Sequence, residues 1–215
     1  EADAVALPGT KNTVADLLTA REAGLGDTLR AFDGPIVGVC GGYQMLGETI
    51  ANASIEGADG QDAVAGFGLL PVETVFSREK RVTRRTVSVD GAGPLSGATG
   101  TVTGYEIHMG TSTIRGDHPE PLEPGSIALD GVVGTYLHGL FENPSVRAAF
   151  VDHVFASAGV DRSAEAGAEA STGVAAGARR IAGAEDGGEV DTSPYAAAAD
   201  LVDEYLDGAV SAYHD

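Results

Sequence analysis

The sequence of 215 residues has little cysteine, no tryptophan and no long apolar segment. It contains one cysteine, Cys40, and no tryptophan. One cysteine excludes an internal disulfide framework and a zinc site built from several cysteines. No closely spaced pair of metal ligands occurs, so we expect no metal site. No apolar run approaches the roughly 20 residues that cross a bilayer, and no basic segment followed by an apolar one indicates a signal peptide. We therefore expect a cytoplasmic protein.

Positive charge is also scarce. Lys and Arg number 13 against 32 Asp and Glu, which gives a formal net charge of −19, and the only lysines are Lys11 and Lys80. Nucleic acids and anionic membranes would be repelled, so neither is an expected partner. An acidic surface can serve solubility alone. The composition favours a second interpretation, adaptation to a cytosol of high salt concentration, where screening weakens the self-repulsion.

The first 50 residues alternate between strand and helix patterns. Residues 4–9 form a short apolar run that ends in Pro-Gly, and residues 12–24 have helical spacing with Thr13 as the expected N-cap. The continuous apolar run 34–40 is typical of a strand covered on both faces, and residues 42–51 are expected to form the next helix. This order predicts an α/β fold with a largely parallel sheet.

The remainder divides into three further parts. Residues 64–138 are rich in strand patterns separated by Gly, Pro and Asp, and residues 143–159 return to helical spacing. We expect a domain over residues 1–160, a flexible Ala/Gly/Glu-rich linker over 161–192 and an amphipathic helix over 193–215. The chain opens at Glu1 without Met and almost directly in a strand, which suggests a piece of a longer protein.

The sequence around Cys40 predicts a reactive thiol. Residues 38–42, GVCGG, fit the G-x-S-x-G nucleophile elbow with sulfur in place of oxygen. A residue on such a strand-to-helix turn projects from the sheet, and glycines flank it because a Cβ would clash. The helix N-terminus is expected to lower the pKa of the thiol, and the free Gly41 N–H to stabilise an oxyanion. The alternative is an inert buried cysteine beside a glycine turn.

A nucleophilic cysteine needs a base, usually a histidine. His138 ends the apolar strand VVGTYLHG, where catalytic residues of α/β sheets are often found, and His108 in GYEIHMG has a similar place. Each can also be a polar residue that caps a strand. His118, His153 and His214 are most simply explained as solvated residues.

Five ordered motifs give the chain a specific resemblance. LPGTKNTVADL, GVCGGYQMLG, GFGLLPVET, GYEIHMG and GTYLHGLFEN, within residues 4–158, closely resemble the glutaminase domain of the cobyric acid synthase family. These are class I, Cys-type glutamine amidotransferases of cobalamin biosynthesis. The resemblance implies a flavodoxin-like three-layer α/β sandwich with a mainly parallel, mixed central sheet.

The resemblance also implies roles for individual residues. Cys40 would be the nucleophile that attacks the glutamine amide, and His138 the base and later the acid. The Gly41 N–H and one from the turn that contains Gly9 would form the oxyanion hole. Contacts with the substrate glutamine are implied for Gln44 and for the HMG segment, which comprises His108, Met109 and Gly110.

A third catalytic residue is not assigned. Many class I relatives carry a Glu two residues after the histidine, and this position is Leu140 here. The nearest acid is Glu142. A Cys–His dyad, or an orienting acid from elsewhere such as Glu106, remains open.

The family's second activity has no visible counterpart in this chain. Its full-length members carry an ATP-dependent synthetase domain, and no G-x-x-x-x-G-K-[ST] phosphate loop occurs here. We expect no cofactor in this chain, with ATP and Mg bound by a synthetase domain that uses the ammonia to amidate corrinoid carboxylates of cobyrinic acid a,c-diamide.

Two rival interpretations remain. One is a glutaminase that serves another amide ligase, of the lipid II amidating type or a cobyrinic acid a,c-diamide synthase. The other is a non-catalytic interaction module, against which the presence of both Cys40 and His138 argues.

Overall fold

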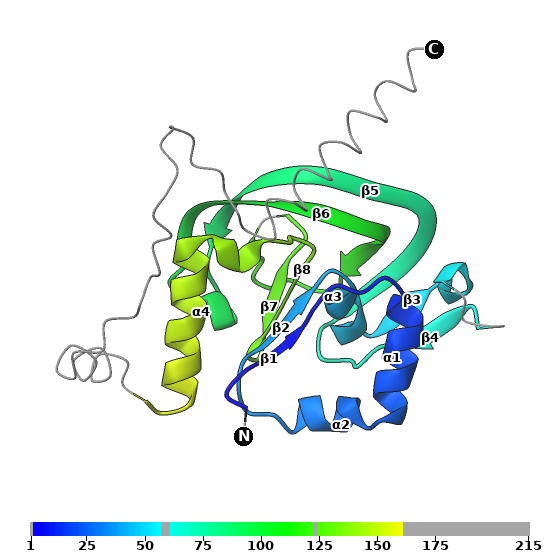
Figure 1. Ribbon diagram of the computed structural model, residues 1–215, viewed down its shortest axis with the longest axis horizontal. Helices are drawn as coiled ribbons and strands as arrows, with labels where there is room; N and C mark the ends of the chain where they lie inside the picture. Colours follow the sequence, from blue (N-terminus) through cyan, green and yellow to red (C-terminus); the bar gives the residue numbers. More distant parts are fainter. Residues whose placement is uncertain (1, 57–60, 123, 161–215) are drawn as a thin grey trace, which may run out of the picture. The chain divides into compact units, whose positions relative to one another are not determined.

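A computed structural model describes residues 2–56, 61–122 and 124–160 of the chain (Figure 1). The linker expected over 161–192 and the helix expected over 193–215 lie outside the described residues. The α-helices within them are α1 (Thr13–Glu22), α2 (Leu25–Arg30), α3 (Gly41–Leu46) and α4 (Pro144–Ser157). Three short 3-10 helices occur at η1 (Ala53–Glu56), η2 (Gly93–Leu95) and η3 (Leu140–Glu142).

The first sheet has the order β1-β2-β8-β7 and is largely parallel. Its strands are β1 (Val5–Leu7), β2 (Ile36–Val39), β7 (Ile127–Leu129) and β8 (Val132–Thr135). β2 lies parallel to both β1 and β8, and the hydrogen-bond register pairs Val39 with Thr135. The carboxyl ends of β2 and β8 therefore meet at one edge of this sheet, which is where both predicted catalytic residues follow their strands.

Both faces of this sheet are covered. Along β2, Ile36 belongs to one cluster of buried apolar residues and Val37 to the other; along β8 the same holds for Val132 and Val133. Successive strand residues point to opposite faces, so the two clusters lie on opposite sides of the sheet. The first cluster includes Leu17 of α1, and the second includes Val146 of α4. The apolar run 34–40 was expected to be a strand with two covered faces, and this is confirmed.

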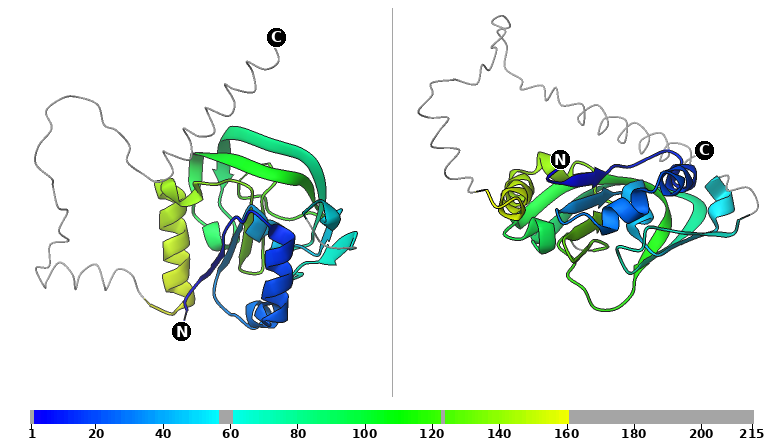
Figure 2. Two further views of the ribbon diagram at one scale, coloured as in Figure 1. Left: turned by 45° about the vertical axis from the view of Figure 1, so that its right-hand side comes forward. Right: turned by 90° about the horizontal axis from the view of Figure 1, so that it is seen from below.

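The second sheet has the order β4-β3-β5-β6 and carries a long hairpin. It consists of β3 (Thr49–Ala51), β4 (Ala63–Ala65), β5 (Val72–Asp90) and β6 (Thr99–Ile114). β5 and β6 form a curved ribbon that passes over the first sheet (Figures 1 and 2). Their pairing is interrupted between Val75 and Lys80 on β5, opposite Gly110 of β6, which has φ 84°. The predicted α/β class is confirmed, with the strands distributed over two mixed sheets.

Two local predictions differ from the structure. The N-cap of α1 is Asn12, whose side chain accepts a hydrogen bond from the Ala15 N–H, rather than Thr13. Thr13 is the first helical residue and is buried. The helix expected over 42–51 ends at Leu46, and β3 begins at Thr49, because the Gly47 C-cap takes an extended conformation (ψ −179°).

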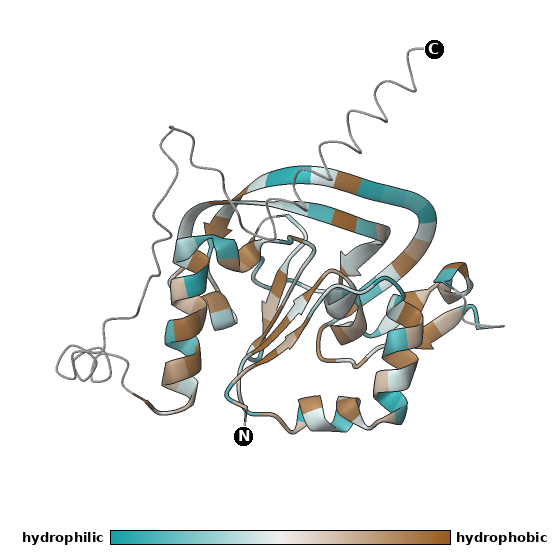
Figure 3. Ribbon diagram, in the orientation of Figure 1, coloured by the Kyte–Doolittle hydropathy of each residue, from teal (hydrophilic) through white to brown (hydrophobic). Residues whose placement is uncertain are grey.

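Hydropathy follows this arrangement. Figure 3 shows hydrophobic residues on the central strands and hydrophilic ones along the outer part of β5. Within the described ranges, no helix combines the length and apolar character that a membrane crossing requires.

Candidate functional site

Cys40 occupies a strained bend between β2 and α3. Its backbone has φ 54° and ψ −112°, a conformation that costs a non-glycine residue about 1–3 kcal/mol. The Cys40 N–H donates to the Thr135 carbonyl at 2.9 Å, which ties the bend to the end of β8. Strain of this kind is retained where the surrounding structure over-determines it, and it is common at functional sites.

The glycines of the elbow are required by space. A Cβ on Gly42 would lie 2.0 Å from the Leu7 carbonyl oxygen, and one on Gly38 would lie 2.4 Å from Cδ1 of Leu46. Both distances are far below van der Waals contact. The two glycines that flank Cys40 in the elbow pattern are therefore required for the expected reason, a steric clash of any Cβ.

Gly9 lies close to both the predicted nucleophile and the predicted base. A Cβ placed on Gly9 would lie 3.0 Å from Cε1 of His138 and 3.7 Å from Sγ of Cys40. The two side chains therefore lie no farther apart than the sum of those two distances. A glycine at this position keeps the space beside the sulfur open.

The expected effect of the helix N-terminus on Cys40 is outweighed by burial. Burial raises the pKa of the Cys40 thiol to about 11; a hydrogen bond from the Gly41 N–H lowers it, and the charges of Glu56 and Glu106 raise it. The thiol is also held by a hydrogen bond to the Ile107 carbonyl at 3.3 Å. The prediction of a lowered thiol pKa was wrong, because α3 offers one N–H whereas the whole side chain is removed from water.

His138 lies beyond β8 and pairs with β6. Its N–H donates to the Tyr105 carbonyl at 2.8 Å, and the Tyr105 N–H donates back to the His138 carbonyl at 3.3 Å. The two rings are stacked with centroids 5.0 Å apart. A Cβ on Gly104 would lie 2.2 Å from the His138 carbonyl oxygen, so this pairing requires a glycine in β6. The imidazole is thereby fixed from a strand more than 30 residues away in sequence.

The electrostatic environment of His138 suits a base. Burial lowers the pKa of His138, the nearby His108 lowers it further, and Glu106 raises it. The imidazole is therefore neutral at pH 7. Its Nε2 atom is buried and has no hydrogen-bond partner among the described residues. A neutral imidazole with a free nitrogen can accept a proton from a thiol.

Asn143 braces the segment after His138, a role that sequence reasoning missed. Its amide group donates to the carbonyls of Gly139, Leu140 and Thr103. Its Oδ1 atom also accepts from the Thr103 N–H at 3.0 Å. The helix expected over residues 143–159 does begin here, since Asn143 is the N-cap of α4, but its side chain makes no capping bond to that helix. The sequence offers only the tripeptide NPS at residues 143–145, which is too common to predict these hydrogen bonds.

Glu106 faces the basic residues of β5. It makes ion pairs of 3.4 Å with both Arg81 and Arg85, and its Oε2 lies 3.7 Å from Nε2 of His108. Burial would raise the pKa of Glu106, but His108 and the two guanidinium groups outweigh burial and hold it below its usual range. Leu140 is a buried core residue. Among the described residues no ion pair joins Glu106 to His138, although the charge of Glu106 raises the pKa of His138, and a third catalytic residue stays unassigned.

Gln44 is completely engaged inside the protein. Its Nε2 donates to the Met109 carbonyl and to the Tyr136 hydroxyl, both at 3.1 Å, and its Oε1 accepts from the Thr13 hydroxyl at 3.4 Å. The side chain is 2 % exposed. Both amide protons are used by the protein, so a direct bond from glutamine to Gln44 would have to use Oε1.

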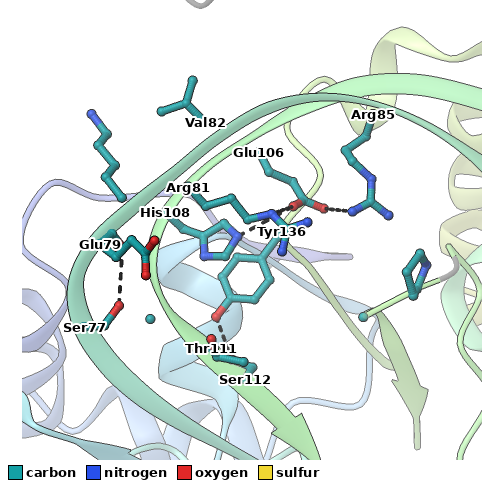
Figure 4. Close-up of a pocket in the computed structure, with 14 residues that line it drawn as sticks. Ser77, Glu79, Arg81, Val82, Arg85, Glu106, His108, Thr111, Ser112 and Tyr136 are labelled. Atoms are coloured by element: carbon teal, nitrogen blue, oxygen red, sulfur yellow. Dashed lines mark hydrogen bonds and ion pairs between the residues drawn. The ribbon is translucent and has the colours of Figure 1, made fainter. Parts of the chain in front are cut away.

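A pocket of about 660 Å³ lies against the hairpin of β5 and β6, beside these residues (Figure 4). Alternate residues of β6 line it, namely Glu106, His108, Gly110 and Ser112. Arg81 and Arg85 of β5 and Tyr136 contribute to other walls. The volume is typical of small-molecule sites, and the mixture of both charges suits a zwitterion. Sequence reasoning did not single out either arginine, although REKRVTRR is conspicuous in so acidic a chain.

His108 is the polar residue of this pocket with unmet hydrogen-bonding capacity. Its side chain is 7 % exposed, and neither ring nitrogen has a hydrogen-bond partner among the described residues. His108 was expected at the end of a strand but lies within β6, directly opposite Arg81 in the register.

The predicted oxyanion groups lie together. A Cβ on Gly41 would lie 3.1 Å from the backbone nitrogen of Thr10 in the turn of residues 8–10, and the Gly42 N–H donates to the Pro8 carbonyl at 3.1 Å. The structure thus places Gly9, Gly41, Cys40 and His138 around one point. The neighbouring stretch of β6 carries His108, Met109 and Gly110. Gln44 of α3 contacts this stretch through its hydrogen bond to the Met109 carbonyl.

The sequence of the chain is similar to sequences of known glutamine amidotransferases. Residues 1–146 match the model of the CobB/CobQ-like glutamine amidotransferase domain. A protein of Halobacterium salinarum named "Probable cobyric acid synthase" is 53% identical over 207 residues, which are 96% of this chain and 36% of that protein. One of the same name from Methanoculleus marisnigri is 46% identical over 74% of this chain and 33% of its own length.

The chain thus spans about a third of the length of the curated relatives that it matches. A solved structure from Thermoplasma acidophilum, described as a candidate GMP synthase component, has a TM-score of 0.50 at 14% identity, covering 73% of this chain and 75% of that one. This likeness concerns the fold alone.

Proposed function

Because the chain belongs to the CobB/CobQ-like glutamine amidotransferase domain family, we propose that it hydrolyses glutamine and releases ammonia. The observation that carries this proposal is the arrangement at Gly9, where the sulfur of Cys40 and the imidazole of His138 both lie within 4 Å of the position that a Cβ would take. A strained nucleophile, a neutral base and backbone N–H donors beside the sulfur are the groups that acyl transfer requires.

The proposed reaction begins with proton transfer. His138 takes the thiol proton as Sγ attacks the side-chain carbonyl carbon of glutamine, and the carbonyl oxygen becomes an oxyanion. The N–H of Gly41 and one from the turn that contains Gly9 stabilise this charge. His138 then returns the proton to the leaving nitrogen, which departs as ammonia and leaves a γ-glutamyl thioester on Cys40. Water, deprotonated by His138, hydrolyses the thioester to glutamate and restores the thiol.

The pocket between β5 and β6 is the proposed site of the amino-acid end of glutamine. Its α-carboxylate would meet Arg81, and its α-ammonium would meet Glu106, whose low pKa keeps it ionised. His108, whose Nδ1 has no partner among the described residues, supplies a further hydrogen bond. Gly110 also lines this pocket, and Gln44 holds the adjoining backbone through its hydrogen bond to the Met109 carbonyl.

The ammonia would serve a synthetase part, which in the relatives lies outside the matched region. The relatives named cobyric acid synthase are about three times as long as the matched region. We propose that their additional part, with ATP and Mg, activates corrinoid carboxylates of cobyrinic acid a,c-diamide for amidation, and that the protein works in the cytoplasm.

The test of the function is direct. We expect the isolated chain to release ammonia from glutamine, slowly, and none from asparagine, whose shorter side chain does not reach Cys40 from the same pocket. Ammonia is measured in a coupled assay, and mass spectrometry of acid-quenched protein should find a glutamyl group on Cys40. Absence of both ammonia and the adduct would contradict the proposal.

The acidic composition leads to a prediction about stability. With a net charge of −19, mutual repulsion destabilises the folded chain, and salt screens it over about 10 Å at 0.1 M and about 3 Å at 1 M. We therefore expect the thermal midpoint to rise between 0.1 M and molar potassium chloride. Calorimetry over this range checks it, and a flat or falling midpoint would remove the proposed adaptation to salt.

A further inference from the structure

Tyr136 is at the centre of a chain of hydrogen bonds that crosses the site. Its hydroxyl lies 3.1 Å from Nε2 of Gln44 and 2.6 Å from Oγ of Ser112, which in turn lies 2.7 Å from Oγ1 of Thr74. The chain joins α3, the segment after β8, β6 and β5. Tyr136 itself is 8 % exposed and lies two residues before His138. A buried network of this kind fixes the relative positions of the elements that it connects.

The ring of Tyr136 supports His108. The two rings are stacked with centroids 3.7 Å apart and an interplanar angle of 14° (Figure 4). No hydrogen bond within the described part of the chain orients the imidazole. Its orientation is therefore set by this stack and by the Glu106 carboxylate, 3.7 Å from Nε2.

The hydroxyl and the ring act on the same three residues of β6. The hydroxyl accepts from Gln44, whose other amide proton is donated to the Met109 carbonyl. The ring holds His108, the neighbour of Met109. On the far side of His108, the Ile107 carbonyl accepts from the Cys40 thiol. A shift of Tyr136 would therefore move the segment 107–109 relative to the sulfur.

We infer that Tyr136 is a positioning residue for glutamine: it holds His108 and Gln44 so that segment 107–109 presents the amino-acid end of the substrate to Cys40. This inference rests on the proposed glutaminase function. Tyr136 takes no part in proton transfer and acts through His108 and Gln44. Its removal affects substrate binding more than the chemical step.

The test is the Tyr136→Phe variant, which removes the hydroxyl and keeps the ring stack. Gln44 loses one acceptor, and a neutral hydrogen bond of this kind is worth about 1 kcal/mol. We expect the KM for glutamine to rise about five- to tenfold while kcat stays within about threefold. An interaction lost equally from ground and transition state produces this pattern.

Tyr43→Phe is the matched control. Tyr43 is a fully buried tyrosine whose ring meets Tyr136 edge-on, with centroids 5.2 Å apart, and its hydroxyl has no partner among the described residues. Removing that hydroxyl breaks no bond, so KM and kcat should both remain at the wild-type values. Ser112→Ala, which removes the other partner of the Tyr136 hydroxyl, should raise KM in the same direction by a smaller factor.

The outcomes separate the inference from the function on which it rests. An unchanged KM in Tyr136→Phe, or a fall in kcat as large as the rise in KM, overturns the positioning role. If Tyr136→Phe does not fold, an unchanged KM in Ser112→Ala overturns it instead. Inactivation by iodoacetamide, which needs no amino-acid recognition, should proceed at the same rate in all variants. A wild type that releases no ammonia contradicts the proposed function itself.

Discussion

A glutamine-like diazo-ketone is expected to alkylate the wild-type chain at Cys40 and nowhere else, with complete loss of ammonia release. The resting thiol has a pKa of about 11 because it is buried, so only about one molecule in ten thousand carries a thiolate at pH 7. A reagent that binds as glutamine does brings its electrophile to the sulfur while His138 accepts the proton. Peptide mapping of the labelled chain identifies the modified residue.

Two comparisons make this result specific. Iodoacetamide, which depends on the free thiolate, should react much more slowly at pH 7 and accelerate as the pH rises toward 11. Cys40→Ser keeps the shape of the elbow and should bind no label and release no ammonia. Labelling of another residue in Cys40→Ser, or rapid alkylation by iodoacetamide at pH 7, would show that the thiol is not activated in this way.

Replacement of His138 by alanine should lower kcat by about 10²–10⁴-fold, the usual contribution of a general acid–base group. The same imidazole generates the thiolate and protonates the leaving ammonia, so both halves of the reaction depend on it. His118→Ala and His153→Ala are the controls, since these residues are partly exposed and lie outside the site. Steady-state ammonia release measures all three. Activity retained in His138→Ala would transfer the role of the base to His108.

The pH profile gives an independent check on the same residue. Only the neutral imidazole accepts the thiol proton, and burial together with His108 lowers the pKa of His138 below its ordinary 6.5. kcat/KM should therefore stay high as the pH falls through 6.5 and decline only below it, because kcat/KM follows the free enzyme. An acidic limb centred above pH 6.5 would contradict the environment described for His138.

Sequence patterns predicted the parts of the site that local sterics decide. GVCGG indicated a nucleophile elbow. Its glycines are required because the neighbouring backbone leaves no room for a Cβ, which on Gly42 would meet the Leu7 carbonyl of β1. The apolar run 34–40 and the strand that precedes His138 likewise predicted where both side chains leave the sheet. The family resemblance supplied the expected roles of Gln44 and His108, which remain proposals.

Only the tertiary structure decided what surrounds these side chains. Cys40 meets Ile107 across 67 residues of sequence, and Gln44 meets Tyr136 across 92. No local pattern specifies which strands approach the elbow, so the role of Tyr136 could not be foreseen. The upward shift of the Cys40 pKa could not be foreseen either, because it results from burial by segments distant in the sequence.

The sequence by itself determined the bend and the positions of the candidate nucleophile and the candidate base along the chain, because glycine spacing and strand hydrophobicity constrain the backbone locally. Tertiary packing decided the remainder. The helix N-terminus that the sequence predicted is present, but the hairpin of β5 and β6 brings Ile107 onto the sulfur and buries it. The desolvation that results outweighs the effect of one backbone N–H and raises the pKa of the thiol, so the proposed mechanism needs His138 to activate it.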